Sequence, residues 1–190
     1  MSYEKTQKIN WLFALLLLLP LCASCGHEAG VKEDWEEQLS EEMPLLGHRN
    51  WIVITDMAYP LQNKPGIETI YTGESFENVI ETVSKKLKKA PHVYAHYYQD
   101  EELKALTDDL CPGIQDYRST VQKFVPENEV SYVRHDKLLS RINSVSNSYN
   151  VLVIKTKLVL PYTSLFIELD CKYWNKDSQE KLEKTLREMK

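Results

Sequence analysis

Two runs of consecutive apolar residues constrain the fold of this chain most strongly. Residues 51–55 read Trp-Ile-Val-Ile-Thr, and residues 151–154 read Val-Leu-Val-Ile. A strand with one face in water alternates apolar and polar residues, so an uninterrupted apolar run indicates a strand that is buried on both faces. Helices must then cover both sides of the sheet. We therefore expect an α/β protein built on a mostly parallel sheet.

Helical patterns lie between the apolar runs. After Ser75, a good N-cap, apolar residues recur at helical spacing over residues 76–87, and lysines gather at the far end. Asp100 is expected to cap a second helix that turns Leu103, Leu106 and Leu110 inward. Further strands are expected at residues 93–98, 129–134 and 165–169, and further helices at 114–124 and 135–142.

This alternation of strands and helices predicts a three-layer αβα sandwich with a mostly parallel sheet. The close spacing of the runs at 151–154 and 165–169 suggests an antiparallel hairpin or short return at one edge. In such folds, ligands bind at the carboxyl ends of the strands.

The first 24 residues have the pattern of a secretory signal peptide. Lys5 and Lys8 precede an apolar run that Pro20 closes after about half of the roughly 20 residues that a membrane-spanning helix needs. Residues 21–26, Leu-Cys-Ala-Ser-Cys-Gly, resemble the lipobox of bacterial lipoproteins. The resemblance implies cleavage after residue 24, lipidation of Cys25, and a protein anchored to a membrane of the cell envelope.

The remaining chain is expected to divide into three parts. Residues 25–42 are strongly acidic and are interpreted as a solvated tether that becomes helical where it meets the domain. Residues 43–170 form the domain, and residues 171–190 form an appended C-terminal helix that packs on the domain or on a neighbour. The formal net charge of −5 argues against a nucleic-acid partner.

The cysteines and histidines do not suggest a metal site. Once Cys25 is lipidated, Cys111 and Cys171 remain in the domain, either paired or free, and neither belongs to a C-x-x-C motif. His92 and His96 are four residues apart, but they lie in a predicted strand, where that spacing separates the two rings. These spacings therefore do not predict a metal site.

Two histidines and one aspartate flank predicted strands. His48 follows Gly47 just before the first strand, Asp56 follows that strand directly, and His135 opens a helix after a later strand. An imidazole has a pKa near neutrality and suits acid–base chemistry. On the residues alone, a histidine on a surface turn and residues that cap loops or helices are the simpler interpretation.

Three segments carry a resemblance to a known family. Residues 46–60 read L-G-H-R-N-W-I-V-I-T-D-M-A-Y-P, residues 132–138 read Y-V-R-H-D-K-L, and residues 161–167 read P-Y-T-S-L-F-I. In this order they resemble motifs of the D-ribose pyranase and L-fucose mutarotase family (RbsD/FucU). The resemblance covers residues 43–170 and implies the same αβα sandwich, a monosaccharide ligand, no cofactor, and a homo-oligomeric ring with sites near subunit boundaries.

Carried over to this chain, the family motifs imply a specific site. His48 is expected to be the catalytic acid–base residue, and Asp56, His135, Tyr162 and Ser164 are expected to bind the sugar. The implied function is an envelope-anchored mutarotase or pyranase that interconverts sugar ring forms or anomers. The alternative is a non-catalytic binding or scaffold lipoprotein, favoured by Ser164 in place of the family's asparagine, by the residues at 49–51 and by the C-terminal extension.

Overall fold

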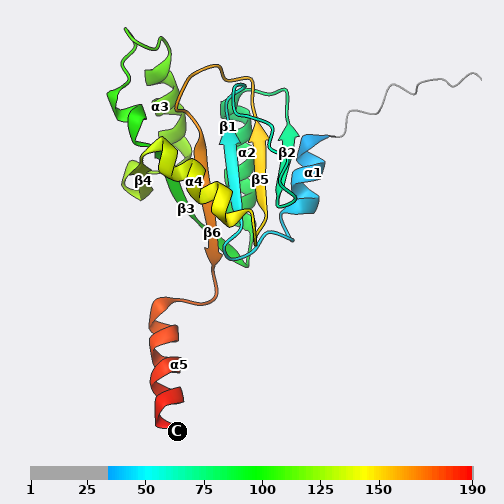
Figure 1. The fold of residues 1–190 in the computed structure, drawn as a ribbon, viewed down its shortest axis with the longest axis vertical. Coiled ribbons are helices and arrows are strands. Elements are labelled where there is room, and N and C mark those ends of the chain that lie inside the picture. The colour runs from blue at the N-terminus through cyan, green and yellow to red at the C-terminus, as the bar shows by residue number, and fades with distance from the viewer. Residues whose placement is uncertain (1–33, 190) are drawn as a thin grey trace, which may run out of the picture. The chain divides into compact units, whose positions relative to one another are not determined.

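A six-stranded sheet forms the centre of the described chain, residues 34–189 of the computed structural model (Figure 1). Its strands are β1 (Trp51–Thr55), β2 (Ile67–Tyr71), β3 (Val93–Asp100), β4 (Val130–Val133), β5 (Val151–Lys155) and β6 (Leu165–Cys171). Across the sheet they lie in the order β2-β5-β1-β6-β3-β4. All run parallel except β6, which is antiparallel to both of its neighbours, β1 and β3. The expected α/β class with a mostly parallel sheet is confirmed.

The position of β6 differs from the expected return at one edge, and that prediction is wrong. Although β5 and β6 are close in sequence, they do not pair with each other. The connection passes β1, and β6 inserts between β1 and β3. Its residues 165–167 and 169 are buried accordingly, as a central strand requires.

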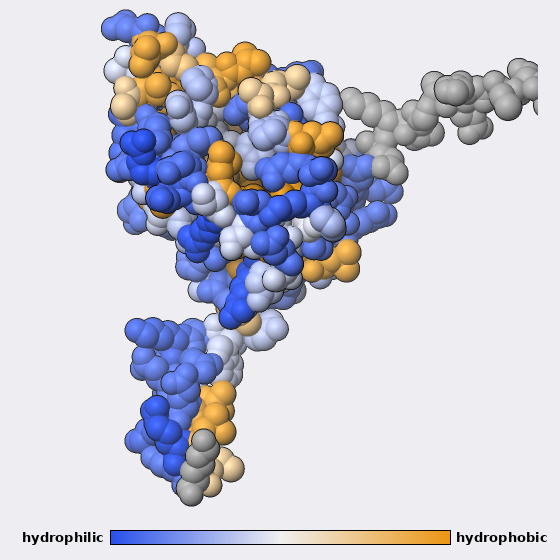
Figure 2. Space-filling view, viewed as in Figure 1, coloured by the Kyte–Doolittle hydropathy of each residue, from blue (hydrophilic) through white to orange (hydrophobic). Residues whose placement is uncertain are grey.

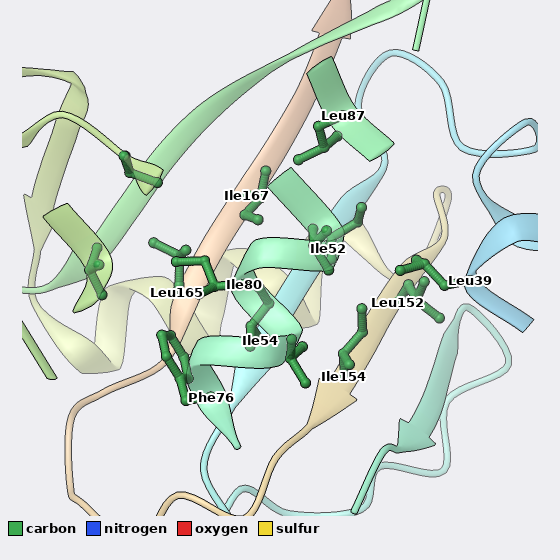
Figure 3. Close-up of a cluster of buried hydrophobic side chains, with 14 of the residues drawn as sticks. Leu39, Ile52, Ile54, Phe76, Ile80, Leu87, Leu152, Ile154, Leu165 and Ile167 are labelled. Carbon is green, nitrogen blue, oxygen red and sulfur yellow. The ribbon is translucent and has the colours of Figure 1, made fainter. Parts of the chain in front are cut away.

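Helices cover both faces of the sheet. The covering helices are α1 (Trp35–Glu42), α2 (Phe76–Lys89), α3 (Ile114–Phe124) and α4 (His135–Val145). The described chain also contains α5 (Lys176–Glu188) and the short 3-10 helices η2 (Glu101–Ala105) and η3 (Glu127–Glu129). Side chains alternate along β1, so Ile52 and Ile54 pack in a core with α1, α2 and α3 (Figure 3). Trp51 and Val53 point the opposite way, into a smaller core beneath α4.

Local sequence explains the helix that was predicted after Ser75. The Ser75 side chain accepts a hydrogen bond from the backbone N–H of Asn78, and three lysines lie in the last turn of α2. One face of α2 buries Val79, Ile80 and Val83 completely. Capping, charge and periodicity therefore agree at this helix.

Other local predictions need correction. No strand was predicted at residues 67–71, where the structure has β2, and in this strand only Ile70 is buried. The helix expected after Asp100 is the short η2, and the Asp100 side chain makes no capping hydrogen bond to it. Leu103 and Leu106 are buried as expected, whereas Leu110 is 71% exposed, because the chain turns away after η2.

The domain begins earlier than residue 43. Helix α1 buries Trp35 and Leu39 in the larger core, so this part of the acidic segment belongs to the packed domain. The predicted signal peptide, residues 1–24, and Cys25 lie outside the described residues. Between residues 34 and 189, no helix has the length and apolar character needed to cross a bilayer. Cys111 and Cys171 are both free thiols, which resolves the alternative left open above.

The appended C-terminal helix is present as α5. No residue from Lys176 to Glu188 is buried, so the helix does not pack on the domain of its own chain. Leu182, Leu186 and Met189 are exposed, and Figure 2 shows apolar side chains along one side of this otherwise polar helix.

Candidate functional site

Four neighbouring strands bring polar residues to one edge of the sheet. Asp56 follows β1, Asp100 ends β3, and His135 follows β4, all at carboxyl ends. Strand β6 runs in the opposite direction, so Ser164, which precedes it, reaches the same edge. The one antiparallel strand therefore adds its amino end to a site formed by carboxyl ends of parallel strands.

A cavity of about 660 Å³ lies at this edge. It is lined by Asp56, Met57, Ala58, Tyr59, Pro60, His135, Leu139, Val159, Leu160, Pro161, Tyr162 and Ser164. The walls are mainly apolar with a few polar groups, and the volume is in the range typical of small-molecule sites. The structure therefore brings all four predicted sugar-binding residues, Asp56, His135, Tyr162 and Ser164, to one cavity.

His135 is held in place from several directions. Its Nδ1 lies 3.1 Å from Oδ1 of Asp100, whose side chain is fully buried. Its backbone N–H donates to the Glu102 carboxylate at 3.0 Å. This bond gives a partner to one of the backbone N–H groups at the start of α4 that have no partner within the helix. Tyr162 packs edge-on against the imidazole, with ring centroids 5.3 Å apart. The position of this imidazole at the cavity wall is therefore well determined.

The segment before β6 contributes Val159, Leu160, Pro161, Tyr162 and Ser164 to the cavity lining. The Tyr117 hydroxyl donates to the backbone carbonyl of Thr163 at 2.8 Å, and the Thr163 hydroxyl donates to the carbonyl of Leu160 at 2.7 Å. Tyr162 has a positive φ of 57°, a left-handed conformation that is uncommon outside glycine. Strained backbone of this kind persists where the surroundings impose it, often at functional sites.

Asp56 is fixed by a local turn. Its Oδ1 accepts a hydrogen bond from the backbone N–H of Ala58 at 2.6 Å. Nearby, burial raises the pKa of Tyr59 to about 12, against the opposing effect of the hydrogen bond from Gln62. The Tyr59 phenol therefore stays protonated at neutral pH.

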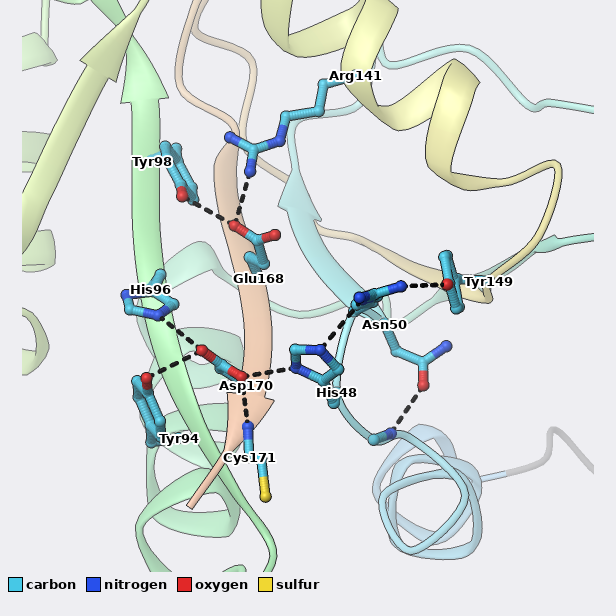
Figure 4. A network of polar contacts seen from close by, with 12 residues as sticks. His48, Asn50, Tyr94, His96, Tyr98, Arg141, Tyr149, Glu168, Asp170 and Cys171 are labelled. Carbon is cyan, nitrogen blue, oxygen red and sulfur yellow. Dashed lines mark hydrogen bonds and ion pairs between the residues drawn. The ribbon is translucent and has the colours of Figure 1, made fainter. Parts of the chain in front are cut away.

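His48 lies outside this cavity. It precedes β1, whereas Asp56 follows it, so the two residues are at opposite ends of a strand about 15 Å long. The Nδ1 of His48 is 2.6 Å from Oδ1 of Asp170, and its Nε2 accepts a hydrogen bond from Nε of Arg49 at 3.1 Å (Figure 4). The structure does not bring His48 to the predicted sugar-binding residues of the same chain.

Asp170 is the centre of the polar cluster that holds His48. It accepts hydrogen bonds from the Tyr94 hydroxyl at 2.9 Å and the Cys171 backbone N–H at 2.7 Å, and His96 Nε2 is 3.5 Å away (Figure 4). Burial alone would raise the pKa of Asp170, but these hydrogen bonds together lower it to about 2. The carboxylate is therefore ionised wherever the protein is folded near neutral pH.

The two histidines that were considered for a metal face have separate partners. His92 Nε2 is 3.0 Å from the Leu46 carbonyl oxygen, whereas His96 faces Asp170. Across residues 34–189, no group of three or more His, Cys, Asp or Glu side chains is arranged to hold a metal ion.

Two of the features that favoured a non-catalytic protein lie away from the cavity. Trp51 is fully buried in the core beneath α4, stacked on Tyr98 at 5.4 Å with the Arg141 guanidinium 4.9 Å from its ring centre. Arg49 donates to the Tyr149 hydroxyl as well as to His48. Neither residue lines the cavity, and nor does α5. The departure at Ser164 remains inside it.

The sequence model of the RbsD / FucU transport protein family matches residues 35–169. The chain belongs to this family. The structure of Bacillus subtilis RbsD complexed with D-ribose superposes with a TM-score of 0.51 at 17% identity, covering 70% of this chain and 91% of that chain. The fucose mutarotase of Streptococcus pneumoniae in complex with L-fucose gives a TM-score of 0.49 at 13% identity, covering 75% and 97%. Among curated proteins, none matches the sequence.

In this RbsD/FucU-family chain, the sequence reasoning missed Asp100 and Glu102 as parts of the site. Both contact His135, one at its ring and the other at its backbone. A signal was present, because Asp100 comes two residues after the strand predicted at 93–98, much as Asp56 directly follows the strand at 51–55. The preference of aspartate for helix N-caps favoured the wrong interpretation.

Proposed function

We propose that this protein is a monosaccharide mutarotase or pyranase, which interconverts ring forms or anomers of a sugar such as ribose or fucose. The observation that carries the proposal is the convergence of Asp56, His135, Tyr162 and Ser164 on one cavity. Family membership supports it, as does the fold shared with a relative that was solved with D-ribose. Carboxylate, imidazole and hydroxyl groups are suited to binding the many hydroxyls of a small sugar.

The reaction requires only a proton acceptor and a proton donor, held in position around the sugar. One group removes the proton from the anomeric hydroxyl while another donates a proton to the ring oxygen, and the hemiacetal opens to a carbonyl. Closure on the other face of the carbonyl gives the other anomer, and closure by a different hydroxyl gives the other ring size. No covalent intermediate with the protein is required, so oriented acid–base groups suffice.

His48 reaches such a site from a second copy of the chain. Within one chain β1 separates His48 from Asp56, but a ring of subunits can place the His48 edge of one copy against the cavity of the next. Head-to-tail contacts of this kind close into rings. The side chain of His48 is 53% exposed, which leaves it accessible to a neighbour. We therefore propose a homo-oligomer in which His48 acts in the neighbouring copy's site.

The proposed enzyme works in the cell envelope. The lipobox-like sequence that ends at Cys25 supports lipidation there, and a lipid-modified amino terminus would hold the domain at a membrane surface. Labelling with a radioactive or alkyne-tagged fatty acid tests this part, because Cys25→Ser should abolish label incorporation while Cys22→Ser should retain it. Label that persists in Cys25→Ser would reject Cys25 as the modified residue.

The alternative is a sugar-binding protein without catalytic activity. One observation favours it: Ser164, which is 3% exposed, offers a single hydroxyl where the family's asparagine offers both an amide donor and a carbonyl acceptor. The alternative retains the cavity and the ligand class and differs in the absence of accelerated exchange.

Exchange NMR on D-ribose and L-fucose tests the proposal. The purified protein should accelerate interconversion of anomers or ring forms, and Asp56→Asn should weaken the acceleration without unfolding the protein, because asparagine can keep the turn to Ala58. Lys157→Gln, a substitution outside the cavity lining, is the control. If a folded, assembled sample binds sugar by saturation transfer but accelerates no exchange, the mutarotase function is rejected in favour of the non-catalytic sugar-binding protein.

A further inference from the structure

The most unusual polar group near the cavity is the carboxylate of Asp100. The residue is fully buried, and neither of its oxygens has a directed hydrogen bond within the described part of the chain. Within the described residues, the ion-pair partner of this carboxylate is Nδ1 of His135, 3.1 Å from Oδ1. Buried polar groups are nearly always satisfied, so an exception of this kind needs an explanation.

The fold itself gives no such explanation. Asp100 sits at the N-cap position of η2 but makes no capping hydrogen bond there. The nearby guanidinium of Arg134 pairs with Glu102 at 3.0 Å instead. Burial, and then the negative charges of Glu102 and Asp56, raise the pKa of Asp100, while His135 acts in the opposite direction.

The other titratable groups facing the pair do not supply a cation. Burial raises the pKa values of Tyr59 and Tyr117, so both phenols remain neutral near pH 7. Tyr162 contacts the edge of the His135 ring, and Glu102 holds its backbone. His135 is thus the group toward which the Asp100 carboxylate is directed.

We propose that His135 is a second catalytic acid–base residue of the sugar site and that Asp100 is its positioning residue. This inference rests on the proposed mutarotase function. The Nδ1 atom of His135 is buried against Asp100, whereas the side chain as a whole is 36% exposed and lines the cavity. With a proton on Nδ1, 3.1 Å from Oδ1 of Asp100, the ring presents the lone pair of Nε2 to a bound sugar.

The proton transfers balance with two imidazoles. Nε2 of His135 takes the anomeric hydroxyl proton, and the electron pair of that O–H bond becomes the second bond of the new carbonyl. The bond from the anomeric carbon to the ring oxygen breaks, and its electron pair stays on the ring oxygen. The proton comes from His48 of the neighbouring copy in its imidazolium form, in which Nε2 carries a proton instead of accepting the hydrogen bond from Arg49. Ring closure reverses both transfers, so each histidine regains its starting state.

Asp100 contributes by selecting the reactive form of the ring. A carboxylate at Nδ1 favours the Nδ1–H tautomer and stabilises the imidazolium that forms when Nε2 accepts a proton. The edge contact of Tyr162 and the hydrogen bond from the His135 backbone to Glu102 limit rotation of the ring and movement of its helix. The same three contacts leave Nε2 as the free position.

Asp100→Asn, His135→Gln and Asp136→Asn test this assignment in the full assembled protein. Asp136 is a matched control, because it adjoins His135 in sequence but its side chain is 71% exposed and does not line the cavity. Nitrogen-15 NMR of the histidine rings reports the tautomer of His135, and exchange NMR gives kcat and KM for the sugar. Thermal unfolding checks that each variant is folded.

The expected results separate a positioning role from a structural one. His135 should be mainly the Nδ1–H tautomer in the wild-type protein and should lose that preference in Asp100→Asn. This variant should lose about 10- to 100-fold in kcat with KM changed less than threefold, and His135→Gln should lose about 100-fold or more, in the range of general acid–base catalysis. Asp136→Asn should match the wild type.

Two results would overturn the assignment. One is an Nε2–H tautomer of His135 in the wild-type protein, a measurement that needs no variant to fold. The other is wild-type catalysis that Asp100→Asn leaves intact, or changes only through KM. A wild-type protein that accelerates no sugar exchange at all fails differently, because it rejects the proposed function together with the catalytic role of His135.

Discussion

Asp170 and His48 form the shortest polar contact between the last strand and the segment that precedes the first, with Oδ1 and Nδ1 2.6 Å apart. The same carboxylate also receives hydrogen bonds from Tyr94 and from the backbone of Cys171. One acidic side chain thus connects β6, β3 and the approach to β1. It also leaves the imidazole of His48 with a fixed orientation at an exposed edge of the sheet.

Asp170 should make stability depend on pH in the acid range. Its pKa in the folded protein is about 2, below the ordinary value of 3.8, so its contribution is complete above about pH 4 and disappears as the pH falls toward 2. The shift corresponds to about 2 kcal/mol before solvent screening, and we expect about 1 kcal/mol for this partly exposed group. Asp170→Asn should therefore lower the free energy of unfolding by about 1 kcal/mol at pH 7 and hardly at all near pH 2.

Urea unfolding of the wild type and Asp170→Asn from pH 2 to 7 measures this difference. Asp136→Asn serves as the control, since that carboxylate is 71% exposed and its ion pair with Lys137 is long, at 4.0 Å. A constant gap between wild type and Asp170→Asn across the pH range would show that ionisation of Asp170 has no part in the effect.

The boundary of the domain can be tested with two leucines. Leu39 of α1 is fully buried, so Leu39→Ala should cost about 2–4 kcal/mol of unfolding free energy. Leu182 of α5 is 42% exposed, and Leu182→Ala should change it by less than about 0.5 kcal/mol. Denaturant titration compares the two variants, and equal costs would contradict the packing of α1 or the exposure of α5.

A charge on Asp56 should matter more for sugar binding than for folding. Asp56→Asn keeps an oxygen for the turn to Ala58 but removes the carboxylate, so the dissociation constant for the sugar should rise about tenfold. Saturation-transfer NMR measures the affinity, and thermal unfolding should show little change. A large drop in unfolding temperature with unchanged affinity would mark Asp56 as structural.

Mixed oligomers should reveal that His48 acts in the neighbouring site. His48→Ala and Asp56→Ala should each be nearly inactive alone, because every site then lacks one group. After denaturation and joint refolding at equal amounts, about a quarter of the sites combine an intact cavity with an intact His48 from the next copy. Exchange NMR should detect this recovered activity. If His48 acted in the cavity of its own chain, no site in the mixed oligomer would be complete and no activity would be recovered.

The sequence was most informative where local and tertiary signals agreed. The N-cap at Ser75, the apolar face of α2 and the uninterrupted runs in β1 and β5 all predicted elements that the structure contains. Strand β2 was not predicted, because it lies at the edge of the sheet and only Ile70 in it is buried, so its sequence has no apolar run.

Long-range pairing was the part that the sequence left undetermined. The position of β6 depends on contacts with β1 and β3, which are far from it along the chain, and no local pattern encodes them. Residues that lie at the same edge of the sheet were predicted as individuals, and their convergence at one cavity needed the strand order. The separation of His48 from Asp56 follows from the length of β1 alone, and in that respect the sequence already contained the answer.

The central position of β6 has a consequence for how the molecule is made. The sheet consists of two parallel halves, β2-β5-β1 and β3-β4, and β6 is the strand that joins them. Because β6 is the last strand to leave the ribosome, it cannot pair with β1 and β3 and so join the two halves until synthesis of the domain is nearly complete. The cavity is lined by Asp56, which follows β1 in one half, and by His135, which follows β4 in the other. These two residues therefore come together only when β6 pairs with both halves. A chain truncated before β6 should have no ligand site to offer, however well its helices form.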